Sequence, residues 1–137
     1  MRRTMVKFER IEKTSYENYC SSSLDKAQFG LDTLRDALID YRNAGILGIR
    51  YDRALGYVDA RLFLVLSKKG QANEAEQCLL KSLEEFQRDM KKYGTENGVA
   101  KREDVLCLIE KIDAGMNVKW KNLRGDKVDR QTINHIP

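Results

Sequence analysis

Residues 70–86 read Gly-Gln-Ala-Asn-Glu-Ala-Glu-Gln-Cys-Leu-Leu-Lys-Ser-Leu-Glu-Glu-Phe, and this stretch decides the fold. Gly70 ends one helical pattern, a short polar turn follows, and a new amphipathic helix begins with the small residue Ala75. Asn73 precedes Glu76 by three residues, which is the spacing of a capping box at a helix start. Two helices joined by so short a turn pack against each other. The stretch therefore predicts a helical hairpin, but it does not identify the partner that the hairpin serves.

The composition is that of a single helical domain. The chain has 137 residues, of which 42% are hydrophobic and 34% charged, and its one proline is the last residue, Pro137. An interior without proline favours long helices. No apolar run approaches the roughly 18 residues of a membrane span, and the basic start lacks the apolar stretch of a secretory signal. We therefore expect a cytoplasmic protein that makes no membrane contact.

Apolar residues recur with helical spacing in four segments, which predict helices at 24–43, 51–69, 74–93 and 100–114. The clearest stripe, in 24–43, consists of Leu24, Ala27, Leu31, Leu34, Leu38 and Tyr41. The same spacing fits a coiled coil, although the stripe is shorter than three to four heptads. Residues 1–19 are expected to hold a weaker helix. The predicted fold class is all-α with four to five helices in a single domain over residues 1–115.

Residues 62–66, Leu-Phe-Leu-Val-Leu, are apolar on every side of the second predicted helix. A helix that is apolar all round is buried all round, so this helix is expected at the centre of the fold. The same helix also carries Asp52, Asp59 and Arg61. Buried charges need partners, so we expect these side chains to form structural ion pairs.

From Asp59 to Phe86 the chain resembles a tetratricopeptide repeat (TPR), a helix pair of about 34 residues. Gly70 matches the turn glycine and Ala75 the small residue that opens the second helix. The residues that match the other apolar and small positions are Leu62, Leu79 and Ser82. The chain departs from the family pattern where Asp59 replaces a tryptophan, Phe63 a small residue and Gln87 a proline. If 24–43 is the second helix of a preceding unit, Ala27 is its small residue, 48 residues before Ala75. A plain helical bundle is the alternative.

The TPR resemblance implies antiparallel helical hairpins in an α-α superhelix whose groove holds a peptide. It places Tyr57, Leu64 and Lys68 toward this groove. An apolar Leu64 there implies cover, from a partner, a second subunit or the chain's own N-terminal segment. The leading functional hypothesis is a non-enzymatic protein–protein interaction module, or scaffold, whose partner is a protein, a peptide or a second copy of the chain.

The alternative hypothesis is nucleic-acid binding through the basic ends. Residues 1–13 and 116–137 each carry five basic and two acidic side chains, while the net charge of the whole chain is +4. In the expected C-terminal arm, 116–137, the residues that could contact phosphates and stack on a base are Lys119, Trp120, Lys121 and Arg124. We favour the other interpretation of this arm, in which Trp120 and Leu123 fold back over an exposed helix end.

The sequence offers no familiar catalytic or metal-binding pattern. It contains no phosphate-binding loop, dinucleotide fingerprint, serine-hydrolase elbow or zinc-protease motif. The single histidine, His135, is near the C-terminus, and the three cysteines, Cys20, Cys78 and Cys107, are far apart. We expect these thiols to be buried in a reducing compartment. The prediction is a protein without enzyme activity, cofactor or metal.

Overall fold

The computed structural model describes residues 2–94, 99 and 101–115, which form five α-helices and no strand. The helices are α1 (Arg2–Cys20), α2 (Leu24–Asn43), α3 (Tyr51–Lys68), α4 (Ala72–Tyr93) and α5 (Arg102–Asp113). The all-α prediction is confirmed. None of the described helices is long and apolar enough to cross a membrane. The predicted arm 116–137 lies outside the described residues.

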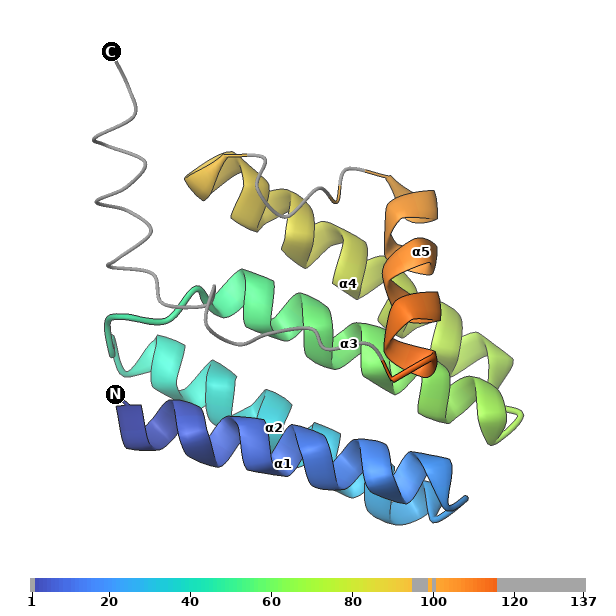
Figure 1. The fold of residues 1–137 in the computed structure, drawn as a ribbon. Coiled ribbons are helices and arrows are strands. Elements are labelled where there is room, and N and C mark those ends of the chain that lie inside the picture. Colours follow the sequence, from blue (N-terminus) through green and yellow to red (C-terminus); the bar gives the residue numbers. More distant parts are fainter. Residues whose placement is uncertain (1, 95–98, 100, 116–137) are drawn as a thin grey trace.

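Figure 1 shows the first four helices side by side in chain order, with α5 running across α3 and α4. Helix α3 is central, because it packs against α2, α4 and α5. The predicted apolar stripe of α2 lies inside the bundle, where Ala27, Leu31, Leu34 and Leu38 are all buried. Helix α1 packs against α2, and its Phe8 is buried with its ring centroid 5.8 Å from that of Tyr41.

The part of α3 that is buried on every side lies earlier than expected. All eight residues of 53–60 are buried, whereas Phe63 and Leu64, within the expected 62–66 run, are only half-buried. The apolar run at 62–66 predicted the wrong position for the most buried part of α3, because Arg53 and Asp59 are charged and yet buried. The expected pairing of charges is confirmed, since Asp59 meets Arg35 of α2 and Arg61 meets Glu12 of α1, each at 3.0 Å.

Helices α3 and α4 approach each other closely at a glycine. A Cβ atom added to Gly56 would lie 2.8–2.9 Å from three carbons of the Phe86 ring, so only glycine fits there without a shift. Beside this contact, the Ser82 hydroxyl of α4 donates a hydrogen bond of 2.7 Å to the Gly56 carbonyl. The Ser82 hydroxyl is therefore satisfied inside the core, where an unpaired polar group would be costly.

The start of α4 differs from the prediction. The helix begins at Ala72, its N-cap is Gln71, and no side chain caps it, so the capping box predicted at Asn73 and Glu76 is wrong. Glu76 instead forms an ion pair with Arg102 of α5. A carboxylate does cap α5, where Asp104 accepts a hydrogen bond of 2.9 Å from the Lys101 backbone N–H.

The prediction of buried cysteines is wrong for two of the three. Cys20 and Cys107 are exposed, Cys78 is half-buried, and all three are free thiols. Burial raises the pKa of the Cys78 thiol to about 11, so this sulfur is protonated at neutral pH and is a weak nucleophile. Leucines flank Cys107 in the sequence, but its own side of α5 faces solvent.

Candidate functional site

An open groove of about 610 Å³ lies between α1 and α2, and its lining is mainly apolar. The lining residues that matter most are Arg10, Ile11 and Ser15 of α1 and Lys26, Phe29 and Gly30 of α2. Phe29 is 73% exposed, although a phenylalanine gains free energy when it leaves water. The groove therefore presents a large aromatic side chain without cover among the described residues.

The floor of the groove contains a close contact between α1 and α2. A Cβ atom on Gly30 would lie 2.4 Å from the Ser15 hydroxyl oxygen, so glycine at this position lets α1 approach α2. Ser15 itself is buried beneath the groove. Phe29, the residue of α2 that precedes Gly30, is exposed. The open space above the Ser15–Gly30 contact, beside the exposed Phe29 ring, can hold side chains of another molecule.

The charged residues that line the groove are two cations, Arg10 and Lys26, and one carboxylate, Asp25. Arg10 and Lys26 are both exposed, and neither forms an ion pair with any residue that the structure describes. The acidic residue at the rim, Asp25, is already paired with Lys69 at 2.8 Å, and this hydrogen bond holds the pKa of Asp25 below its usual value. Two cations therefore remain available to a partner.

The residues predicted from the TPR resemblance lie on α3. Tyr57 is buried, and its ring meets the Phe86 ring edge-on at a centroid distance of 5.1 Å. Leu64 is half-buried and lines a small cavity with Tyr16 and Tyr19 of α1. Helix α1 thus supplies part of the cover that was expected over Leu64. Nothing tests the role of these residues, and a site there stays a prediction.

Lys68, the third residue of that predicted site, is exposed at the end of α3. Its ammonium nitrogen lies 4.7 Å from the centroid of the Tyr19 ring and donates a hydrogen bond of 3.3 Å to the Tyr19 carbonyl. Lys68 therefore helps to hold α1 beside α3. The alternative nucleic-acid site, Lys119, Trp120, Lys121 and Arg124, lies outside the described residues.

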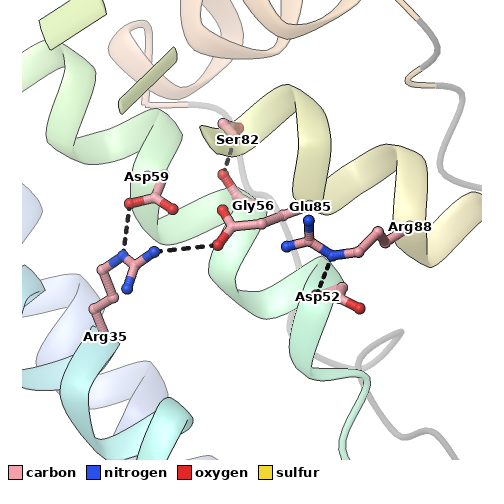
Figure 2. A network of polar contacts seen from close by, with 7 residues as sticks. All are labelled: Arg35, Asp52, Gly56, Asp59, Ser82, Glu85 and Arg88. Atoms are coloured by element: carbon pink, nitrogen blue, oxygen red, sulfur yellow. Dashed lines mark hydrogen bonds and ion pairs between the residues drawn. The ribbon is translucent and has the colours of Figure 1, made fainter. Parts of the chain in front are cut away.

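A buried polar network joins α2, α3 and α4 (Figure 2). Arg35 donates one hydrogen bond from Nε to Asp59 at 3.0 Å and another from Nη2 to Glu85 at 3.3 Å. The side chains of Asp59 and Glu85 are only 1% and 4% exposed. At the other end of the view, Arg88 pairs with Asp52 at 3.2 Å. One guanidinium therefore faces two carboxyl groups inside the protein.

The two carboxyl groups do not both ionise at neutral pH. Burial, a hydrogen bond to Asp59 and the charge of Asp59 raise the pKa of Glu85 to about 10. Among the side chains that the structure describes, Asp59 Oδ2 and Glu85 Oε1 are the buried oxygens that accept no hydrogen bond from a nitrogen or hydroxyl donor. A proton on Glu85 that is shared with Asp59 satisfies both oxygens and leaves one negative charge opposite Arg35. Neither carboxyl lines the α1–α2 groove or the cavity beside Leu64.

A second buried ion pair fixes the segment that leads into α3. Arg50 binds both oxygens of Asp89, at 2.9 and 2.6 Å, and both side chains are completely buried. The Arg50 guanidinium also lies 4.2 Å from the centroid of the Tyr93 ring. A bidentate pair with a stacked aromatic ring compensates for part of the desolvation cost of both charges.

One residue of the groove carries a signal in the sequence. Phe29 lies off the apolar stripe of 24–43, on the side of the helix that carries polar residues. A large aromatic side chain at such a position indicates contact with something outside the bundle. The cations Arg10 and Lys26 carry no comparable signal, because isolated surface charges are common.

Comparisons with known proteins add no family or fold relationship. No protein-family model matches the chain, and no match was found among curated proteins or solved structures.

Proposed function

We propose that the protein is a non-enzymatic protein–protein interaction module that holds a helical segment of a partner protein in the groove between α1 and α2. The observation that carries this proposal is the 73% exposure of Phe29 inside an open apolar groove. Aromatic side chains supply much of the binding free energy at protein interfaces when a partner buries them. Grooves between helices are common receptors for amphipathic helices.

The proposal includes a TPR-like arrangement of antiparallel helical hairpins. The turn residue Gly70 has a φ of +81°, and the Gln71 backbone N–H donates a hydrogen bond of 2.9 Å to the Leu66 carbonyl, closing a turn between α3 and α4. Ala75 and Leu79, in the first turns of α4, are both buried. These features support a hairpin at the position where the sequence resembles the repeat.

The α1–α2 groove is a better docking site than the predicted surface on α3. Phe29 is open to solvent, whereas Tyr57 is in the core and Leu64 is half-buried beside α1. A partner that used Tyr57 would first have to separate it from Phe86 of α4. A partner in the groove requires no such rearrangement, which favours rigid docking.

Selection from an unbiased library of displayed helical peptides tests the proposal. The target is the full chain, and the counter-target is Phe29→Asp, which puts a charge in the groove without altering the core. Leu80→Asp is the matched control, because Leu80 is an exposed apolar residue on α4. We expect peptides that bind the parent and Leu80→Asp proteins but not Phe29→Asp. A selection in which every enriched peptide binds Phe29→Asp equally well would refute the groove as the docking site.

A further inference from the structure

From the charges at the groove, and resting on the function proposed above, we infer that the partner segment is an acidic amphipathic helix with a carboxylate at each end of its apolar face. Arg10 and Lys26 are the cations that meet these carboxylates. Phe29 and Ile11 lie between them and meet the apolar face. The exposure of Phe29 alone does not specify the chemistry of the partner, whereas the two cations do.

The spacing of the two cations follows from the packing of α1 on α2. Ser15 faces Gly30, so this pair fixes the register of the two helices. The short turn after α1 reverses the chain, with the Ser23 backbone N–H bonded to the Asn18 carbonyl at 2.8 Å. Arg10 therefore lies on one side of the Ser15–Gly30 contact and Lys26 on the other. At 1.5 Å per helical residue, their backbones are separated by about 13 Å along the groove.

That separation sets the pattern of the partner. A helix that lies along the groove covers about 13 Å in roughly nine residues. Its two carboxylates therefore stand two to three turns apart on the face that carries the apolar residues. Asp25 does not oppose this arrangement, because Lys69 already neutralises it. An extended strand is a poorer occupant, since the groove is formed by two helices whose backbone groups are used within the helices.

A second copy of this chain is a poorer occupant of the same surface. A symmetric dimer brings identical patches together. Whichever way the two grooves are aligned, Arg10 and Lys26 of one copy would then face Arg10 and Lys26 of the other copy. Like charges at an interface oppose association, whereas carboxylates on a different protein satisfy both cations.

The test compares peptides selected on three proteins: the parent chain, Phe29→Asp, and the double variant Arg10→Glu, Lys26→Glu. We call peptides that bind the parent protein but not Phe29→Asp Phe29-dependent. Among them, we expect enrichment of Asp or Glu at two positions separated by two to three turns. The charge-reversed protein should select Lys or Arg at those positions. Arg10→Ala and Lys26→Ala should each weaken the best acidic peptide by roughly two- to fivefold, as expected for exposed ion pairs.

The outcomes separate this inference from the proposed function. Phe29-dependent peptides without acidic enrichment would overturn the inference and leave the groove as the docking site. A complete lack of Phe29-dependent peptides would overturn both. A dimer that light scattering detects in the parent chain and not in Phe29→Asp would also overturn the inference. Far-ultraviolet circular dichroism verifies that each variant keeps its helices, which is expected because Arg10 and Lys26 are exposed.

Discussion

Replacing Glu85 by glutamine should stabilise the protein at neutral and alkaline pH, although it alters a buried network. Glu85 has a pKa of about 10 in the folded protein and an ordinary value of 4.5, to which it returns on unfolding. At a pH between 4.5 and 10, Glu85 is ionised in the unfolded chain but protonated in the folded protein. The stability that Glu85 contributes is therefore fully present below pH 4.5 and falls as the pH rises toward 10. Glutamine has no proton to lose, so the penalty disappears.

The size of the effect follows from the pKa difference. Each pH unit above 4.5 costs about 1.4 kcal/mol, which gives an upper bound of roughly 3 kcal/mol at pH 7. Glutamine keeps both hydrogen bonds of the neutral acid, because its amide NH₂ can donate to Asp59 while its carbonyl accepts from Arg35. We therefore expect Glu85→Gln to raise the free energy of unfolding by about 1–3 kcal/mol at pH 7, with little change near pH 4.5.

Urea unfolding of the parent and variant at pH 4.5, 7 and 9 measures this difference. Glu84→Gln is the matched control, because Glu84 is the preceding residue of α4 and is exposed. Its substitution should leave the free energy of unfolding within about 0.5 kcal/mol of the parent at each pH. If Glu85→Gln is no more stable than the parent at pH 9, Glu85 is ionised in the folded protein and the shared proton does not exist.

The remaining predictions concern packing and the groove. Leu66→Ala should lower the free energy of unfolding by roughly 2–5 kcal/mol, since Leu66 is only 5% exposed. A loss below about 0.5 kcal/mol, measured by urea unfolding, would place Leu66 at the surface. Gly56→Ala should lower the melting temperature more than Gly30→Ala does. The Cβ added at position 56 meets the rigid Phe86 ring, whereas the Cβ added at position 30 meets a Ser15 hydroxyl that can rotate. An equal effect of the two substitutions would contradict the close contact at Gly56. Ala75→Leu should cost roughly 1–3 kcal/mol in urea unfolding through overpacking, and a variant as stable as the parent would mean that Ala75 faces solvent.

The helices could be predicted from sequence because their apolar residues recur every three to four positions. Leu31, Leu34 and Leu38 are buried as their spacing required. The burial of Asp59 could not be predicted in the same way, because its partner Arg35 is 24 residues away and on another helix. The sequence required a partner for Asp59 but could not identify it. The raised pKa of Glu85 likewise depends on a neighbour that only the packing of α3 on α4 provides.

The groove was harder to predict than the core. Its floor depends on Gly30 and Ser15, whose approach is a property of two packed helices rather than of either sequence segment. The TPR resemblance directed attention to Tyr57, Leu64 and Lys68 instead. Periodicity shows which side of a helix is apolar, but it does not show which apolar side chains a neighbouring helix will cover. Leu64 is half-buried beside α1, whereas Phe29 has no such cover among the described residues.

Amide chemical shifts of the ¹⁵N-labelled full chain, recorded while a selected Phe29-dependent peptide is added, test the central claim most directly. If the partner segment docks between α1 and α2, the largest shifts will fall in residues 10–18 and 25–33, and Phe29→Asp will abolish them. Shifts concentrated instead around Tyr57, Leu64 and Lys68 would contradict the groove as the docking site and would favour the surface on α3.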